Sequence, residues 1–362
     1  MKERRKRNMS RTGLLFMFCL LMLCGCAQIT GFMENTEVSG REVESLAAEK
    51  EDDTVLLGGM PVGIYMETDG VLVLDTEKMT GMDGKEYTPA QGVVSSGDYI
   101  TEVNHQKIEG KKQLMDLVEH LDGEKVLLTV RRENTILEKK LTPVQISKGN
   151  YRLGIWVRDN VQGLGTITFL TKNNRFAALG HGIHDVDTST LLTIKRGTLY
   201  RTSIQKVQKG SKGNPGTMEG IIVYNRFHQL GVIEKNTDEG IYGELNSDRS
   251  WIGEEVPIQE EKKEEIKTGE ARIRCYIDGE VKEYTICITQ IDKESDQVNK
   301  GMVIQVTDTE LLEKTGGIIQ GMSGSPIIQN GKLIGAVTHV FVQDSTKGYG
   351  IFIENMLKEE ES

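Results

Sequence analysis

The stretch GGIIQGMSGSPII, residues 316–328, is the most informative segment of this sequence. Ser323 lies in a glycine-rich turn, where the backbone can bend sharply and leave the serine hydroxyl exposed. The same turn can aim the amides of Gly321 and Ser323 at one point, and such oxyanion donors are worth roughly 3 kcal/mol each. A glycine-rich turn with an idle serine is the alternative interpretation of this stretch alone.

The residues after the turn favour a nucleophilic serine. The sequence NGKLIGAV, residues 330–337, supplies a tight turn and a second strand after the serine. This order resembles the serine-bearing hairpin of chymotrypsin-like peptidases. We therefore interpret Ser323 as a candidate nucleophile, with Gly321 and Ser323 as its oxyanion hole.

A serine hydroxyl is a weak nucleophile unless a base accepts its proton, so a histidine is required. The segment AALGHGI, residues 177–183, places His181 at the end of a small-residue strand and between two glycines. This setting resembles the histidine turn of the same peptidase class. His184 is the nearest rival, and a surface or hydrogen-bonded histidine is the alternative interpretation.

A carboxylate normally completes such a site because it fixes the imidazole tautomer and stabilises the imidazolium. Asp308 follows a strand-like run at residues 302–306 and precedes Ser323 by fifteen residues. We choose it as the third member, with an ordinary solvated loop position as the alternative. The sequence also leaves open Asp185, Asp187, Asp292, Asp296 and Asp344.

Two domains are expected from the pattern of strands and helices. Residues 54–145 combine short β-like runs with one helical stretch at residues 111–121, which predicts a small sheet capped by a helix. Residues 146–362 show recurring short strand-like runs, separated by turn dipeptides such as Asp278-Gly279, which predicts a barrel or sandwich. The chain as a whole is expected to be mainly β.

Residues 1–26 have the order of an export signal, because six basic residues precede an apolar run. Cys26 ends a segment that resembles a bacterial lipobox, whereas an extended apolar run would nearly suffice for an uncleaved anchor. A lipoprotein, an anchored protein and a released protein all remain open. Residues 27–53 are polar and acidic, and we expect a spacer that is open to self-cleavage.

The charge balance argues against nucleic acid as a partner. The chain has a net charge of −10, and residues 1–26 carry six basic residues and one acid, so the remainder carries −15. Cys275 and Cys287 follow the leader and either form one disulfide or stay unpaired. No Cys and His spacing typical of zinc occurs, and His181 with His184 alone is a weak metal signal, so no metal or cofactor is expected.

Three ordered blocks resemble one family, the stage IV sporulation protein B peptidases of endospore-forming Gram-positive bacteria. They are GIWVRDN at residues 154–160, ALGHGI at residues 178–183 and TGGIIQGMSGSP at residues 315–326. The resemblance covers residues 55–354 and implies His181, Asp308 and Ser323 as a catalytic triad. It also implies a PDZ domain followed by a chymotrypsin-like double β-barrel.

The resemblance implies a peptide-binding site as well. Residues 59–64, GMPVGI, resemble the carboxylate-binding loop of a PDZ domain, and residues 96–104 resemble the hairpin that usually accompanies it. In a PDZ domain, loop amides hold the C-terminus of a peptide that adds as a strand. The binding residues implied by this likeness are Met60, Pro61, Val62, Gly63 and Ile64.

The family further implies a setting and partners. Its best-known members cross the forespore inner membrane, cleave themselves and cleave a regulator of an intramembrane metalloprotease, which activates a late sigma factor. Two other functions remain open from the sequence. One is a catalytically idle PDZ adaptor, and the other is a general quality-control protease of the cell envelope.

Overall fold

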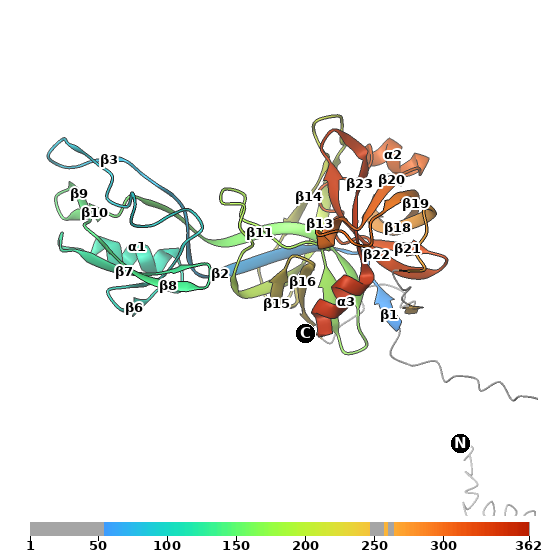
Figure 1. The fold of residues 1–362 in the computed structure, drawn as a ribbon, viewed down its shortest axis with the longest axis horizontal. Coiled ribbons are helices and arrows are strands. Elements are labelled where there is room, and N and C mark those ends of the chain that lie inside the picture. The colour runs from blue at the N-terminus through green and yellow to red at the C-terminus, as the bar shows by residue number, and fades with distance from the viewer. Residues whose placement is uncertain (1–53, 247–256, 260–263, 362) are drawn as a thin grey trace, which may run out of the picture. The chain divides into compact units, whose positions relative to one another are not determined.

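The computed structural model describes residues 54–246, 257–259 and 264–361, and this part of the chain is mainly β (Figure 1). The expected leader at residues 1–26 and the expected spacer at residues 27–53 lie outside the described residues. None of the helices in the described part is long and apolar enough to span a membrane.

Six strands close into a first barrel in the order β11–β12–β16–β15–β13–β2, and a pairing of β11 with β2 closes the ring. Buried side chains such as Ile64, Phe176 and Leu199 fill its interior. The strands β1 and β17 extend the sheet beyond β11, and β14 pairs with β13. The bounds are β1 (Thr54–Leu57), β2 (Pro61–Thr76), β11 (Ile155–Leu170), β12 (Arg175–Ala178), β13 (Ile194–Gln208), β14 (Thr217–Ile222), β15 (Gln229–Thr237), β16 (Gly240–Leu245) and β17 (Pro257–Gln259).

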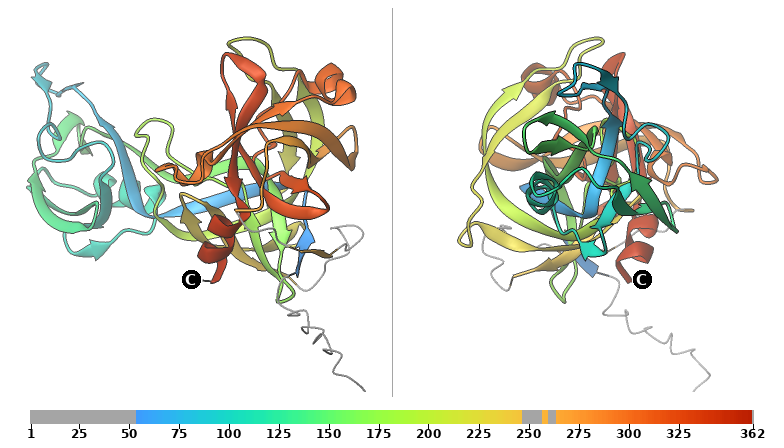
Figure 2. Two further views of the ribbon diagram at one scale, coloured as in Figure 1. Left: turned by 45° about the vertical axis from the view of Figure 1, so that its right-hand side comes forward. Right: turned by 90° about the vertical axis from the view of Figure 1, so that its left-hand side faces the viewer.

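A second closed barrel, coloured orange to red in Figure 2, has the order β18–β19–β20–β23–β22–β21. The predicted turns Asp278-Gly279 and Asn330-Gly331 join β18 to β19 and β21 to β22, and both residues of each turn have positive φ. Such values are required by tight hairpins, so these two turns are confirmed. The bounds are β18 (Gly269–Ile277), β19 (Glu280–Ile291), η1 (Val298–Lys300), β20 (Met302–Val306), α2 (Thr309–Thr315), β21 (Pro326–Gln329), β22 (Lys332–Phe341), β23 (Asp344–Phe352) and α3 (Ile353–Glu361).

A PDZ-type domain is formed by the chain between the barrel parts of β2 and β11. The C-terminal part of β2 pairs with β5 and with the start of β11, and β5 pairs with β7. Helix α1 adds Leu114 to the domain core, as the helical pattern predicted. The bounds are β3 (Met79–Thr80), β4 (Glu86–Tyr87), β5 (Tyr99–Val103), β6 (Gln106–Lys107), α1 (Lys111–Glu119), β7 (Val126–Arg132), β8 (Thr135–Leu141), β9 (Val144–Ser147) and β10 (Asn150–Arg152).

The sequence predicts that the first domain begins at residue 54, but in the structure residues 54–68 pair with strands of the first barrel. Strand β1 pairs with β11 and β17, and residues 61–68 of β2 pair with the barrel strands β11 and β13. Residues 54–68 therefore belong to the first barrel. The PDZ-type domain is an insertion between two barrel strands, and the expected linear order misses the barrel strands that precede it.

The two cysteines of the described part are both free. Cys275 lies opposite Lys282 and Cys287 lies opposite Glu270 in the β18–β19 hairpin, so neither faces the other. Cys275 is fully buried in the second barrel, and this burial raises the pKa of its thiol. Of the two possibilities that the sequence left open, the structure shows the unpaired one.

Candidate active site

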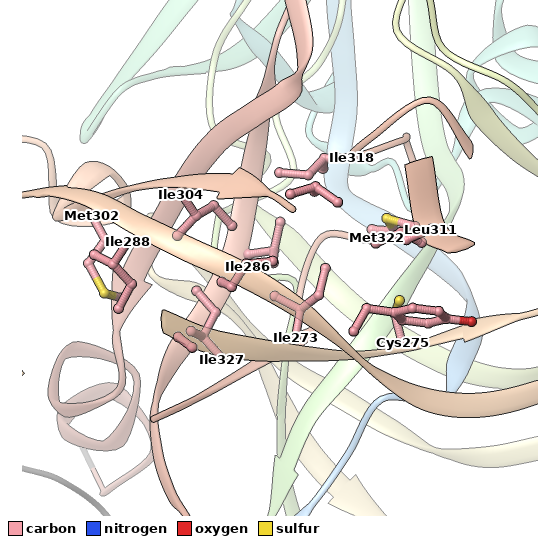
Figure 3. Packing of buried hydrophobic residues seen from close by; sticks show 14 of the residues in the cluster. Ile273, Cys275, Ile286, Ile288, Met302, Ile304, Leu311, Ile318, Met322 and Ile327 are labelled. Atoms are coloured by element: carbon pink, nitrogen blue, oxygen red, sulfur yellow. The ribbon is translucent and has the colours of Figure 1, made fainter. Parts of the chain in front are cut away.

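The turn that carries Ser323 is anchored in the second barrel. Ile318, Ile319 and Met322 are buried in the same apolar cluster as the barrel strands, and Figure 3 shows Met322 and Ile318 among them. Burial of three apolar side chains around one turn fixes its backbone, at about 1.5–3 kcal/mol for each side chain. Ser323 itself stays partly accessible between these anchors.

The first barrel holds the same turn from the other side. Thr166 of β11 donates its hydroxyl to the Gly321 carbonyl at 2.8 Å and its amide to the Ser323 carbonyl at 2.9 Å. Thr168 donates its hydroxyl to the Gly324 carbonyl, also at 2.8 Å. The carbonyls of Gly321, Ser323 and Gly324 therefore point to β11.

Glycines make this backbone path possible. Gly321 has φ of 102° and Gly324 has φ of 91°, both in a region that only glycine adopts easily. A Cβ on Gly324 would lie 2.0 Å from the Thr166 carbonyl oxygen. The amides of Gly321 and Ser323 donate to no other group within the described residues, so both are available as the expected oxyanion donors.

The hydroxyl of Ser323 donates to the Thr338 carbonyl in β22 at 2.8 Å. It therefore rests against the second barrel and makes no hydrogen bond to a histidine. Ser325, the other serine of the turn, is fully buried and cannot reach a substrate. Ser323 is thus the accessible serine of this turn.

His181 follows β12 and is half-buried between Gly180 and Gly182. Its Nδ1 lies 2.9 Å from the Gly182 carbonyl oxygen, and a carbonyl can only accept a hydrogen bond. The neutral ring therefore carries its proton on Nδ1, and Nε2 keeps the lone pair that a base needs. Burial of the ring lowers the pKa of His181, so the ring is neutral at pH 7.

One cavity of about 420 Å³ brings His181 and Ser323 together, with Gly321, the expected oxyanion donor, in its wall. Both barrels contribute to it, because His181 follows a strand of the first barrel and Ser323 precedes a strand of the second. The ring of His339 packs against His181 with 4.6 Å between ring centroids. His184, the rival base, does not line this cavity and its Nε2 lies 3.7 Å from Asp238.

The structure does not bring Asp308 to this site, which corrects the expected triad. Asp308 is the N-cap of α2, and its side chain accepts from the Leu311 amide at 3.1 Å and from the Thr285 amide at 3.3 Å. Both carboxylate oxygens are engaged in holding backbone, and Asp308 does not line the Ser323 cavity. Asp308 lies fifteen residues before Ser323 because it caps the helix that precedes the turn carrying Ser323.

The other carboxylates that the sequence left open also lie elsewhere. Arg158 binds both Asp185 and Asp187, the latter at 2.7 Å. Burial opposes ionisation of Asp185, yet hydrogen bonds from Thr188 and Arg158 keep its pKa below the usual value. Asp292, Asp296 and Asp344 do not line the cavity either. Within the described residues, the orienting partner of His181 is therefore the Gly182 carbonyl.

Sequence reasoning missed a hairpin tip that supports the nucleophile turn. Residues 209–216 join β13 to β14. Gln320 exchanges backbone hydrogen bonds with Gly216 of this tip at 2.8 Å and with Met218 of β14 at 2.9 Å. Gly210 donates to the Thr315 carbonyl, and Gly213 donates to the Val342 carbonyl. The composition of this tip, rich in lysine and glycine, indicates only a surface loop. It does not reveal these contacts, because their partners lie about a hundred residues away in the chain.

The structure also corrects the expected peptide-binding loop. Met60 precedes β2, and residues 61–64 pair with β11 on one side and, for Val62 to Ile64, with β13 on the other. Val62 and Ile64 are buried in the first barrel. These residues have no free strand edge, so they cannot receive a peptide as an added strand.

A groove of about 660 Å³ lies instead between α1 and residues 149–157. Leu114, Met115 and Val118 of α1 line one side, and Leu153 to Val157 line the other. Gly154 has φ of 69°, and the amides of Leu153 and Gly154 donate to no group within the described residues. The first residues of the block at 154–160, on which the family resemblance rests, therefore line this groove.

The described residues contain no group of three or more His, Cys, Asp and Glu side chains placed to hold a metal ion. The comparison with curated proteins gives a putative zinc metalloprotease of Helicobacter pylori strain J99, 28% identical over 180 residues. The alignment covers 43% of this chain and 50% of that protein, so the chain spans about half the length of this relative.

Solved structures with similar folds include proteases and a PDZ domain. The M. tuberculosis protease in its active form has a TM-score of 0.32 at 16% identity, covering 55% of this chain and 74% of that chain. The HtrA-type protease AlgW with a decapeptide has a TM-score of 0.32 at 12% identity, covering 56% and 53%. The PDZ domain of an SdrC-like protein from Listeria monocytogenes has a TM-score of 0.20 at 24% identity, covering 25% and 87%.

The family model of the SpoIVB peptidase S55 matches residues 149–357, which is more than half of the chain and includes His181, Ser323 and the whole second barrel. The likeness stated from three short blocks is thereby confirmed over a continuous segment. The chain belongs to the SpoIVB peptidase S55 family.

Proposed function

We propose that this chain is a serine endopeptidase that cleaves itself and a membrane-associated regulator during sporulation signalling. One observation carries the chemistry: a single cavity joins Ser323, His181 and the oxyanion donor Gly321 at the junction of two barrels. The family to which the chain belongs supports the sporulation setting. The groove beside α1 supports a protein substrate or activator, because it leaves a strand edge for a peptide.

In the proposed reaction the Ser323 hydroxyl leaves the Thr338 carbonyl and donates to Nε2 of His181. As Oγ attacks the carbonyl carbon of the peptide bond, Nε2 takes the proton and the amides of Gly321 and Ser323 hold the oxyanion. His181 then donates this proton to the leaving amine, which breaks the C–N bond and leaves an acyl-enzyme. Water hydrolyses the acyl-enzyme by the same proton route.

The proposed setting is outside the cytoplasm. The basic and apolar order of residues 1–26 supports export, with the chain tethered at its N-terminus or released into the space between the forespore and mother-cell membranes. The proposed substrate there is the regulator of an intramembrane metalloprotease, in addition to the chain itself. A net charge of −15 beyond the leader supports protein partners and not nucleic acid.

The test compares the full chain with its Ser323→Ala variant. Both are purified, incubated alone and with the candidate regulator, and followed by gel electrophoresis and mass spectrometry. We expect fragments of the chain and of the regulator only from the unsubstituted protein. Equal fragmentation by the variant, or none by either protein, would contradict the proposal and would leave a peptide-binding module as the better description.

A further inference from the structure

The cavity at Ser323 has an uncharged lining. Its walls are formed by aliphatic and small polar residues, together with the two imidazoles of His181 and His339, and no Asp, Glu, Lys or Arg side chain lines it. Burial lowers the pKa of both histidines, so they too are neutral at pH 7. A charged substrate side chain would therefore find no counter-charge in this cavity.

The part of the cavity next to the oxyanion donors is the part that receives the substrate residue on the acyl side of the scissile bond. When a substrate carbonyl oxygen points to the Gly321 and Ser323 amides, the side chain of the same residue faces the segment that leads into them. That segment contributes Ile318, Ile319 and Gln320 to the wall. The end of β22, with Thr338, His339 and Val340, forms the wall beside it.

The depth of this region is limited by Ile318. Its side chain packs so closely on Gly348 of β23 that a Cβ on Gly348 would lie 2.7 Å from Ile318 Cδ1. Ile318 and Ile319 are only 2% and 1% exposed, because both belong to the barrel core. Figure 3 shows Ile318 in this core. The floor is thus closed by aliphatic side chains of the barrel core.

We infer that the substrate carries an uncharged aliphatic residue immediately before the scissile bond. This inference rests on the proposed role of Ser323 and His181 and adds a substrate class to it. Contact with an aliphatic floor favours apolar side chains in proportion to the area they bury. A buried, unpaired charge costs several kcal/mol, which corresponds to at least about a 100-fold loss in kcat/KM.

The experiment uses the full chain and a set of internally quenched peptides that differ only in the residue before the scissile bond. Ala, Val, Leu and Met are compared with Lys, Arg, Asp and Glu, and Ser323→Ala serves as the blank. We expect cleavage of the aliphatic set, with kcat/KM about 100-fold above that of the charged set. Cleavage of charged peptides at a similar rate overturns the inference while the peptidase stands.

A variant tests whether the cavity wall itself sets this preference. Val342 lines the cavity but is 55% exposed, so Val342→Asp adds a carboxylate without burying it. We expect the ratio of Lys to Leu cleavage to rise about fivefold, the scale of one partly exposed ion pair. Ile136→Asp, at a similarly exposed position in β8 outside the cavity, is the matched control and should leave the ratio unchanged. An unchanged ratio in both variants contradicts the inference, whereas failure of every peptide with every protein contradicts the proposed function.

Discussion

At the scale of single residues, substitutions of Asp308 can distinguish a structural carboxylate from a catalytic one. It caps α2, whose Leu311 belongs to the same buried cluster as Met322, the neighbour of Ser323. Asn caps helices as well as Asp does, whereas Ala removes the cap at a cost of about 1 kcal/mol. We therefore expect Asp308→Asn to retain most of the activity and the stability, and Asp308→Ala to lose about 1 kcal/mol of unfolding free energy.

Urea denaturation and kcat/KM, measured on both variants, check this prediction. A member of a catalytic triad gives the opposite pattern, because Asn cannot hold the charge that an imidazolium needs. Loss of about 10⁴-fold in kcat with Asp308→Asn at unchanged stability would therefore restore Asp308 as the carboxylate of the site. His181→Ala is the reference for a complete loss of the base.

The pH dependence of activity and stability follows from the two stacked histidines. Burial lowers the pKa of His181, while desolvation and the neighbouring His181 and Lys300 lower the pKa of His339 to about 4. A group with a lowered pKa binds more protons in the unfolded chain, so its contribution is fully present above pH 6.5 and is lost as the pH falls toward 4. The acid limb of kcat/KM should likewise lie below pH 6.5, since His181 must be neutral to act as a base.

These expectations are checked on Ser323→Ala, which cannot cleave itself. Its unfolding free energy, measured in urea between pH 7.5 and pH 4.5, should fall with pH less steeply when His339→Asn is added. A parallel decline in both proteins would show that His339 contributes nothing to the pH dependence. For activity, an acid limb centred above pH 6.5 would contradict a buried, neutral base.

At the scale of elements, the hairpin tip at residues 209–216 holds the turn that carries Ser323. Gly216 is buried, and a Cβ there would lie 2.3 Å from the Gln208 carbonyl oxygen and 2.6 Å from Ile319 Cγ2. Because the first of these is a backbone atom, Gly216→Ala must displace the tip and its hydrogen bond to Gln320. We expect kcat to fall on the order of 100-fold, the scale of losing one oxyanion donor, with KM little changed.

Lys212→Ala is the matched control, because Lys212 lies at the same tip and is exposed. It should keep the kcat of the unsubstituted chain. Thermal melting of both variants separates a local displacement from unfolding. A Gly216→Ala protein with normal kcat would argue against a positioning role. So would a protein whose loss of kcat is fully accounted for by the unfolded fraction seen in the thermal melt.

The helices and strands also show which features of the fold could be predicted from the sequence. Ser323 and His181 line one cavity, and the sequence alone singles them out because their glycine-rich turns are local features. Their catalytic roles stay a prediction. Helix α2 was missed although Asp308 and Gly316 provide its N-cap and its left-handed C-terminal residue, a signal that the sequence contains. Residues 59–64 resemble a peptide-binding loop in sequence, but residues 61–64 form a barrel strand in the structure. Their role is decided by strand partners about a hundred residues or more away, in β11 and β13. No local pattern reveals such partners.

At the scale of the whole chain, β11 connects the two functional sites. Its residues 155–157 line the groove beside α1, and its residues Val161 to Leu164 line the cavity at Ser323. Asp159, between them, accepts a hydrogen bond from the Lys111 amide at the start of α1. We therefore expect a peptide that adds as a strand along the groove to order the same strand that forms a wall of the cavity.

We expect a peptide with a free C-terminus, bound in the groove, to raise kcat for a short unrelated substrate on the order of tenfold. The measurement is a titration of this peptide against the cleavage rate, with its C-terminally amidated form for comparison. Met115 is 54% exposed in the groove wall, so Met115→Glu should abolish the activation without unfolding the domain. Ile136→Glu, exposed in the same domain but outside the groove, should retain it. Activation that persists in Met115→Glu, or a rate that does not respond to saturating peptide, would show that β11 carries no coupling between the sites.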